Sequence, residues 1–465
     1  MTNKKCQVFT PEFYGKELLN NVDYQGPSIL EKVFLENSVG EGNILILAVQ
    51  EYIEEAIKQN ISNAQIKHQL EKYFIAFEID KSIITKCKKR LDNLTSIYDI
   101  FNVKWNIKNE NYLFYKGHID ADYIVGNPPY IRYTDIEEDE RKKLKEKFIS
   151  CSIGKFDYCY AFIERSLEDL NATTGKMAYF IPSSIFKNTF GSNLRQIMLN
   201  DIFRVTDFQH RNVFGKALTS PAIISFEKKS YNQNLEYIGM DTNAYININK
   251  KHFKDKWIFS EPNTKVQSSN LLRFGDFFQV NNSVATLLNE AFVIKDNLEV
   301  DIENEVLRNA ASPRGISNKQ KEKIIFPYYF DKSGSWKRYN ESEFILKFPG
   351  AAHHLRRYSN KLSNRKADGL WFEYGRTQAL RHLNKEKLLI SSIITDKLKV
   401  NKLSKDVIPY SGFFITAIST FSLNKAIEIL ESYEFENYIL DQAINANGKS
   451  VRISVNDVKN FTFED

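Results

Sequence analysis

The sequence predicts an α/β domain with a doubly wound parallel sheet, followed by a mixed α+β domain. Up to about residue 230, short apolar runs alternate with amphipathic helical patterns, which is the order typical of a parallel sheet covered by helices. Several predicted strands end in acidic or polar residues, and such sheets bind ligands at the carboxyl ends of their strands. Beyond residue 230 the pattern is less regular, with more aromatic residues and turn formers.

The predicted elements follow one another without long gaps in the first half of the chain. Strands are expected at 32–36, 73–80, 121–126, 176–182, 205–210 and 220–229, and helices at 43–59, 81–94, 159–170 and 190–200. The polar stretch 227–237 has no apolar periodicity and marks the expected boundary. We therefore expect two domains, residues 1–230 and 231–465.

Composition excludes several classes of protein. With 42% hydrophobic and 26% charged residues, the 465-residue chain is typical of a soluble globular protein. Residues 1–10 have no apolar segment of the kind found in signal peptides, and apolar runs such as 44–49 are too short to cross a bilayer. The four cysteines show no zinc-binding spacing. We expect a cytoplasmic protein with unpaired thiols, no bound metal and no membrane partner.

Two strand ends carry residues suited to a nucleotide-like ligand. Glu36 ends the first strand, and Gly40 and Gly42 in the turn "LENSVGEG" would let a ligand approach the backbone, although the spacing is not GxGxxG. Glu78 ends the second strand, where an acidic residue commonly accepts hydrogen bonds from ribose hydroxyls. The neighbouring Asp80 fits better as a carboxylate at the start of the next helix.

The third long strand runs into the segment "GNPPY", residues 126–130. Proline lacks a backbone donor and fixes φ, so the chain must leave the sheet at Asn127 and cannot enter a helix at once. Taken alone, Pro-Pro after a strand could be no more than a stiff turn.

In this order the motifs resemble the class I, S-adenosylmethionine-dependent methyltransferases, and specifically the γ-ordered DNA amino-methyltransferases of restriction-modification systems. The resemblance covers about residues 8–230 and includes "FTPEFYGKELL", "LENSVGEG", "FEID", "GNPPY", "KFDYCYAFIERSL", "GKMAYFIPSSIF" and "NVFGKALTSPAIISF". It implies S-adenosyl-L-methionine as cofactor. The implied cofactor-binding residues are Thr10, Glu36, Gly40, Gly42, Glu78, Ile79, Asn111, Tyr112 and Asn127.

The resemblance also assigns the catalytic residues, which are Asn127, Pro128, Pro129 and Tyr130. The exocyclic amine of adenine is a poor nucleophile because its lone pair is delocalised into the ring. The Asn127 side-chain oxygen and the Pro128 carbonyl can accept two hydrogen bonds from this amine, drawing the nitrogen toward tetrahedral geometry. Tyr130 would stack on a base flipped out of the duplex, with Phe214 and Phe162 also near it.

Two parts of the sequence depart from the family pattern. In the cofactor loop, Asn37 replaces the usual proline and Glu41 places a carboxylate inside the turn. Further along, Asn111 and Tyr112 occupy the places of the family's aspartate and phenylalanine. Asn111 could still bond the cofactor's adenine and Tyr112 could stack on it, so these departures bear on cofactor affinity.

The second half contains a basic region. Residues 311–410 hold 21 Lys and Arg against 9 Asp and Glu, a net +12 in a chain whose total is +6. Aromatic residues are interleaved with these charges, a mixture that suits nucleic acid; they are Trp336, Tyr339, Tyr358, Trp371, Phe372 and Tyr374. The expected DNA-binding residues are Arg356, Arg357, Arg376 and Arg381, although a solvated charged face would give the same count.

The predicted function is site-specific methylation of adenine N6 in duplex DNA, as the modification enzyme of a restriction-modification system. The second half resembles a target-recognition domain in the segments 274–294, 323–334 and 386–398. Because the first motif begins at Phe9, we expect any endonuclease partner to be a separate chain. The alternatives are an RNA or protein-glutamine methyltransferase, or a DNA-specificity module with little catalytic activity.

Overall fold

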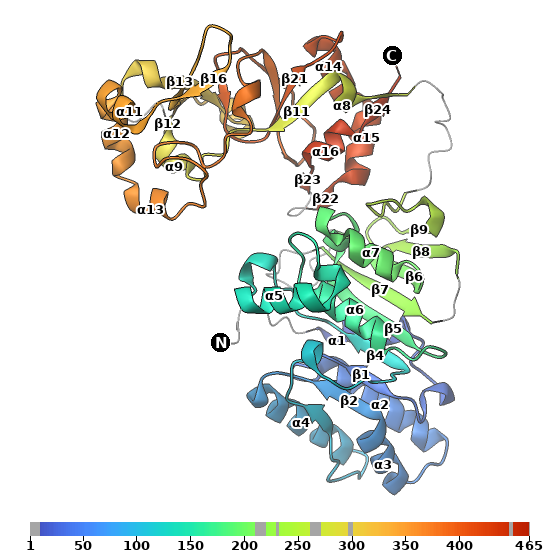
Figure 1. Cartoon of the computed structure of the whole chain (residues 1–465). Coiled ribbons are helices and arrows are strands. Elements are labelled where there is room, and N and C mark those ends of the chain that lie inside the picture. The colour runs from blue at the N-terminus through green and yellow to red at the C-terminus, as the bar shows by residue number, and fades with distance from the viewer. Residues whose placement is uncertain are drawn as a thin grey trace. The chain divides into compact units, whose positions relative to one another are not determined.

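The computed structural model describes residues 10–209, 220–228, 232–260, 271–295, 301–445 and 450–464. Contacts divide the chain into two compact units, Met1–Asn263 and Thr264–Asp465 (Figure 1). This division lies later than the predicted boundary at residue 230. The reason is that two further strands, β8 (Asn234–Gly239) and β9 (Ala244–Asn249), pair onto the sheet of the first unit.

The first unit is built on a nine-stranded sheet in the order β3-β2-β1-β4-β5-β7-β6-β8-β9. Besides β8 and β9, its strands are β1 (Phe34–Glu36), β2 (Phe74–Phe77), β3 (Asn106–Lys108), β4 (Tyr123–Gly126), β5 (Lys176–Pro182), β6 (Ile202–Asp207) and β7 (Pro221–Glu227). Strands β1 to β5 run parallel, whereas β7 is antiparallel to both of its neighbours. Strand β1 lies between β2 and β4, so the strand order reverses there.

Helices cover both faces of this sheet (Figure 1). They are α1 (Glu12–Asn20), α2 (Asn43–Lys58), α3 (Asn63–Tyr73), α4 (Lys81–Ser96), α5 (Glu138–Lys147), α6 (Cys159–Asp169) and α7 (Ser192–Met198). Successive strand residues alternate between the two cores, because side chains along a strand point to opposite faces. Phe34 and Val125 pack with α1 to α4, and Leu35 and Ile124 pack with α6 and α7. The doubly wound α/β prediction is thus confirmed.

The second unit is a mixed α+β structure, as predicted. One sheet has the order β11-β21-β17-β19 and another β12-β14-β13-β20. These strands are β11 (Phe278–Asn282), β12 (Val293–Lys295), β13 (Leu307–Ala311), β14 (Glu322–Ile325), β17 (Lys387–Ile390), β19 (Asn401–Leu403), β20 (Ile408–Pro409) and β21 (Phe413–Ala417). Smaller sheets contain β10 (Leu272–Arg273), β15 (Tyr328–Phe330), β16 (Trp336–Arg338), β18 (Ile393–Ile394), β22 (Ile444–Asn445), β23 (Val451–Arg452) and β24 (Thr462–Phe463).

Short helices pack around these sheets. They are α8 (Phe274–Phe277), α9 (Asn289–Phe292), α10 (Pro313–Ser317), α11 (Glu341–Lys347), α12 (Pro349–Arg356), α13 (Ser359–Ser363), α14 (Leu423–Leu430), α15 (Tyr433–Gln442) and α16 (Val455–Lys459). Two hydrophobic cores result, one around β13 and β14 and one around β11, β21 and β17.

The described residues were compared with the expectations on membrane spans, metal sites and cysteines. None of the helices in the described ranges is long and apolar enough to span a membrane. Within the same ranges, no group of three or more His, Cys, Asp or Glu side chains could hold a metal ion. The cysteines that the structure describes, Cys87, Cys151 and Cys159, are buried free thiols.

Candidate functional site

The reversal of strand order at β1 brings two predicted motifs together. Strands β1 and β4 are paired in parallel, so their carboxyl ends lie side by side, and ligands of doubly wound sheets bind at such a reversal point. The glycine-containing turn follows β1, and the Asn-Pro-Pro-Tyr loop follows β4. The two loops are in contact, because the Ser38 hydroxyl donates to the Asn127 carbonyl at 3.3 Å.

Thr10 forms hydrogen bonds with residues that follow each of the two strands at this edge. Its hydroxyl accepts a hydrogen bond from Asn127 Nδ2 at 3.1 Å, and its carbonyl accepts one from Asn43 Nδ2 at 3.0 Å. Asn43 is the first residue of α2. The segment before α1 therefore fixes the Asn127 amide relative to the start of the helix that follows the glycine turn.

The glycine turn, residues 37–42, is held from β2. The amide of Val39 donates to the Phe77 carbonyl at 3.0 Å, and the amide of Gly40 donates to Glu78 Oε2 at 3.1 Å. Gly40 and Gly42 have φ values of +53° and +84°, in the left-handed region that favours glycine. A Cβ on Gly40 would meet no atom within 4 Å, whereas one on Gly42 would lie 2.7 Å from Cys87 Sγ. Gly40 thus leaves open space, and Gly42 allows the turn to pack on α4.

Glu36 is buried behind this turn, with 2% of its surface exposed. Its carboxyl group accepts a hydrogen bond from the Leu45 amide near the start of α2. It thereby satisfies a helix N-terminal amide that the capping residue, Gly42, cannot reach because it has no side chain. Burial, with a smaller contribution from the charge of Glu78, raises the pKa of Glu36 well above its usual range. Glu36 Oε2 has no hydrogen-bond partner among the described residues.

Glu78 is oriented by the backbone around it. Its Oε1 accepts hydrogen bonds from the amides of Ile79 at 2.9 Å and Asp80 at 3.0 Å. Asn109 Nδ2 donates to the carbonyls of Glu78 and Ile79, which ties this strand end to the segment after β3. Ile79 is 56% exposed and offers an apolar surface beside the turn. Asp80 accepts from the Ser82 amide and caps α4, which confirms its predicted structural role.

The two departures in the cofactor loop have local roles. Asn37 Nδ2 donates to Ser166 Oγ at 2.8 Å and to the Tyr179 hydroxyl, so it anchors the start of the loop to α6 and β5. The Glu41 carboxylate forms an ion pair with Lys86 at 3.0 Å. Arg90 Nη1 also donates to the Glu41 carbonyl at 2.7 Å. The negative charge that Glu41 brings into the turn is therefore balanced by positively charged side chains of α4.

Tyr112 and Phe162 lie in the hydrophobic core, with 1% and 5% of their surfaces exposed. The Tyr112 ring packs against Phe77 and Phe162, with centroids 5.2 and 5.8 Å away, and its hydroxyl donates to Asp169 Oδ2 at 3.0 Å. Stacking of either ring on a cofactor or base would require it to be uncovered, so those roles stay predictions. Asn111 caps the turn that contains Tyr112, because its Oδ1 accepts from the Leu113 amide at 3.0 Å.

The Asn-Pro-Pro-Tyr loop is held by the segment that leads into α6. The Ile131 carbonyl accepts a hydrogen bond from the Tyr158 amide at 2.9 Å, and Tyr133 packs edge-on against Phe156 with ring centroids 5.4 Å apart. Pro128 is buried, and Pro129 and Tyr130 are partly buried. Burial of the Tyr130 hydroxyl raises its pKa well above 10, so the side chain stays neutral.

Sequence reasoning missed Asp157, which lies in this supporting segment. Burial raises the pKa of Asp157 from 3.8 to about 6, against an opposing effect of Arg132. A carboxyl group that titrates near neutrality beside a predicted catalytic loop is a candidate functional group. Its sequence signal was an acidic residue two positions before the predicted helix at 159–170.

The predicted DNA-binding residues differ in how they are placed. Arg356, Arg357 and Arg381 are exposed, and the Arg356 guanidinium lies 5.5 Å from the centre of the Trp371 ring. Arg376 is instead engaged with its own loop: Nη1 donates to the carbonyl of Lys366 and forms an ion pair with Asp368 at 3.0 Å. Phe214, predicted to face the target base, lies outside the described residues.

Most of the aromatic residues in the basic region are not at the surface. Tyr339, Phe372 and Tyr374 are 7%, 0% and 0% exposed and belong to the core around β13 and β14. Trp336, Tyr358 and Trp371 are partly buried against that core. The interpretation of the interleaved aromatics as a nucleic-acid surface is therefore wrong for the first three, since they stabilise the domain instead.

Comparison with known proteins identifies the domain that carries this site. Residues 29–214 match the model of the Eco57I restriction-modification methylase family. This segment, about two fifths of the chain, is similar to a restriction-modification methylase domain. The matched range includes the glycine turn, Glu78 and the Asn-Pro-Pro-Tyr loop, in agreement with the expected resemblance.

Two relatives share the methylase domain and extend beyond it. The chain is 25% identical to the Type II methyltransferase M.AccI of Acinetobacter calcoaceticus over 397 residues, which cover 75% of this chain and 71% of the relative. It is 23% identical to the Type II restriction enzyme and methyltransferase RM.Eco57I of Escherichia coli, covering 84% of this chain. The chain spans 49% of that second relative.

A solved structure, the Type IIL restriction-modification enzyme MmeI in complex with DNA, shares the fold. It matches 97% of this chain and 65% of its own with a TM-score of 0.65, at 13% sequence identity. The likeness confirms the fold class expected for both halves. The names of the relatives as methyltransferases support S-adenosylmethionine as the cofactor.

The two glycines of the turn should respond differently to alanine. Gly42→Ala combines a left-handed φ with overlap on Cys87 and should lower the free energy of unfolding by about 3 kcal/mol. Gly40→Ala introduces the strain alone, about 1 to 2 kcal/mol, but should weaken S-adenosylmethionine binding because its Cβ enters the open space beside the turn. Urea unfolding and calorimetric titration measure the two effects; equal destabilisation with equal affinities would contradict this assignment.

Proposed function

We propose that the protein transfers a methyl group from S-adenosylmethionine to the N6 amine of an adenine flipped out of duplex DNA. The observation that carries this proposal is the pairing of β1 with β4, which joins the glycine turn to the Asn-Pro-Pro-Tyr loop through Ser38 and Thr10. A methylase of this type needs its cofactor and its target amine at one place, and these loops meet at the edge where doubly wound sheets bind ligands.

The residues at this edge fit the cofactor. Gly40 leaves space where any other residue would carry a Cβ. Glu36 Oε2 is a buried acceptor without a partner among the described residues, and a hydroxyl or ammonium group of the cofactor would satisfy it. Glu78 Oε2, which accepts from the Gly40 amide, has a second lone pair for a ribose hydroxyl.

When bound, S-adenosylmethionine supplies a methyl group on a positively charged sulfur. The Asn127 side-chain oxygen and the Pro128 carbonyl would accept hydrogen bonds from the two N–H groups of the adenine amine and so orient its nitrogen to receive that methyl group. The proton that the methylated nitrogen then releases would pass to solvent water. The prolines at 128 and 129 keep both acceptors on a stiff loop, so little is lost to reorganisation. The neutral ring of Tyr130 stacks on the base.

Adenine is preferred over cytosine in this proposal because the tyrosine of the loop suits a flat purine. The unit Thr264–Asp465 would recognise the DNA sequence, in line with its excess of positive charge. Acting on DNA, the protein would work in the cytoplasm.

The proposal is tested by offering the full chain duplex DNA, RNA and a glutamine-bearing protein in parallel, each with S-adenosylmethionine carrying a labelled methyl group. We expect label in duplex DNA only, recovered as N6-methyladenine by mass spectrometry of digested DNA. N4-methylcytosine alone would overturn the choice of base, and label in RNA or protein alone would overturn the choice of substrate. Binding of DNA without transfer would favour a specificity module.

Asn127→Ala should lower turnover by about a thousandfold or more, because its oxygen acts mainly as the amine approaches the transition state. Cofactor affinity, measured by calorimetry, should fall far less. Asn63→Ala, the same change at an exposed residue of α3, is the matched control and should keep wild-type turnover. Near-normal turnover of Asn127→Ala would show that the catalytic residue lies elsewhere.

Arg356, Arg357 and Arg381 should contribute to the salt dependence of DNA binding. Each phosphate contact adds about −0.9 to the slope of log affinity against log salt, so alanine at a contacting residue should flatten the slope by about that amount. Arg376→Ala should change stability more than the slope, since its guanidinium is engaged with Lys366 and Asp368. Fluorescence titrations at several salt concentrations provide the slopes. Unchanged slopes for all three exposed arginines would place the DNA surface elsewhere.

A further inference from the structure

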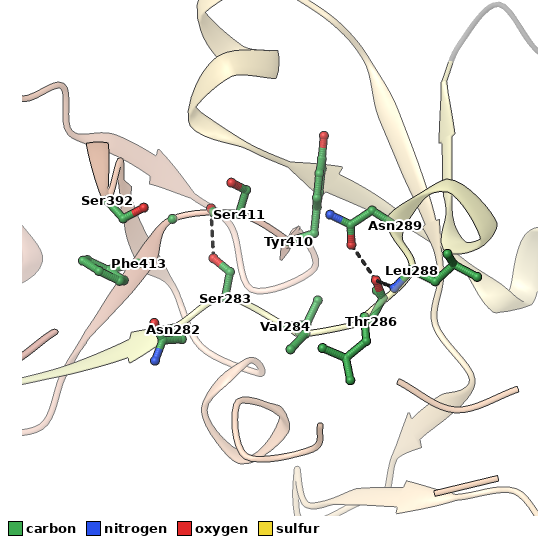
Figure 2. Close-up of a pocket in the computed structure, with 13 residues that line it drawn as sticks. Asn282, Ser283, Val284, Thr286, Leu288, Asn289, Ser392, Tyr410, Ser411 and Phe413 are labelled. Atoms are coloured by element: carbon green, nitrogen blue, oxygen red, sulfur yellow. Dashed lines mark hydrogen bonds between the residues drawn. The ribbon is translucent and has the colours of Figure 1, made fainter. Parts of the chain in front are cut away.

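The second unit contains an open groove of about 460 Å³ (Figure 2). One wall is the segment 282–289, which leads from β11 to α9, and Ser392 and residues 410–413 complete it. None of the lining residues is charged. They present hydroxyl, amide and backbone groups together with a few apolar side chains. The side-chain amides of Asn282 and Asn289 belong to exposed residues.

Leu287 has an unusual conformation at this groove. Its φ is +58°, in the left-handed region that a leucine rarely adopts. Its side chain is nevertheless 48% exposed. Burial of the leucine therefore offsets only part of the free-energy cost of this backbone conformation. A strained residue that the surrounding structure maintains is a reason to look for a function.

The backbone beside Leu287 is fixed from a second segment. The Thr286 carbonyl accepts hydrogen bonds from Arg365 Nη1 at 2.6 Å and from the Gly375 amide at 3.3 Å. The Ala285 carbonyl accepts from the Arg376 amide at 3.1 Å. A Cβ on Gly375 would lie 2.3 Å from Leu287 Cγ, so the absence of a side chain there makes room for the leucine.

The turn also holds itself. The Leu288 amide donates to Thr286 Oγ1 at 3.1 Å, and Thr286 Oγ1 donates to Asn289 Oδ1 at 2.5 Å, as Figure 2 shows. On the groove's other side, Ser283 Oγ donates to the Ser411 carbonyl at 3.0 Å. Leu287 is therefore presented by a turn that is rigid before any ligand binds.

The chemistry around this leucine favours nucleic acid over an apolar partner. The lining offers neutral donors and acceptors, which suit base edges, while phosphates require the positive charge that residues 311–410 supply with their net +12. Ser392 and Tyr410 of the lining lie within that basic region of the sequence. A half-exposed apolar side chain on a hydrogen-bonded turn among such groups matches the wedges that proteins insert between base steps.

We propose that Leu287 is a wedge that enters the base stack of DNA bound along the groove formed by residues 282–289, Ser392 and residues 410–413. The wedge separates two neighbouring bases of the DNA sequence that the second unit recognises. This inference rests on the proposed function, and it assigns one step in the recognition of DNA to a single residue.

The experiment uses the full chain and the duplex that it methylates, with 2-aminopurine placed in turn at each position of the recognised sequence. This analogue becomes more fluorescent when it is unstacked. Leu287→Ala should abolish the fluorescence increase and weaken binding about tenfold, in the range measured for single stacking contacts. Leu287→Phe should retain both. Leu346→Ala makes the same change at a leucine of the same unit that is 85% exposed, and it should behave as wild type.

Leu287→Asn guards against a folding defect, because asparagine tolerates the left-handed region. It should unfold at a temperature no lower than Leu287→Ala and still lose the fluorescence increase. If wild-type protein methylates no duplex DNA, the proposed function fails and the wedge fails with it. If wild-type protein methylates DNA and the Leu287 variants keep its affinity or its fluorescence increase, the wedge alone is wrong. Weaker binding without any change in unstacking would likewise refute it.

Discussion

The reversal of strand order at β1 is the constraint on which the rest of the methylase domain depends. Because β1 pairs with β2 on one side and β4 on the other, the loops that follow all three strands are drawn to one edge of the sheet. Glu78 then accepts a hydrogen bond from the glycine turn, and Ser38 of that turn donates one to the Asn-Pro-Pro-Tyr loop. Hydrogen bonds between loops, rather than any single strong interaction, fix the site before a ligand arrives.

Polar residues that depart from the family pattern are incorporated into the fold. Asn37 lacks the fixed φ of a proline, but its side-chain amide donates hydrogen bonds to Ser166 and Tyr179 in the core. Glu41 brings a charge into the turn, which Lys86 on α4 neutralises. The carboxyl group of Glu36 accepts a hydrogen bond from the Leu45 amide at the start of α2. Its Oε2 has no hydrogen-bond partner in the described part of the chain. The loop is thus rigid without its proline, and its buried acceptor remains available to a cofactor.

The sequence predicted the strands that carry the candidate site better than it predicted the rest of the domain. Buried strands with polar ends are strong local signals, which is why β1, β2, β4 and β5 were anticipated. The hydrogen bonds of Thr10 with Asn127 and of Gly40 with Glu78 were not, because they join segments far apart in the sequence. Helix α3 was missed because its sequence "NAQIKHQLEKY" buries only Ile66, Gln69 and Leu70. The boundary was placed too early because β8 and β9 follow a polar stretch. Tyr374 was misinterpreted because aromatic residues serve cores and nucleic-acid surfaces alike, and only burial separates the two.

The central claim is that the edge formed by β1 and β4 holds the cofactor with its reactive group directed at Asn127. A crystal structure of the full chain with sinefungin, an S-adenosylmethionine analogue that carries an amine in place of the methylated sulfur, tests it most directly. We expect the analogue to lie over Gly40, with a polar group on Glu36 Oε2, hydroxyls toward Glu78, and its amine facing Asn127. Density for the analogue at any other edge of the sheet, or with its amine turned away from Asn127, would contradict the account.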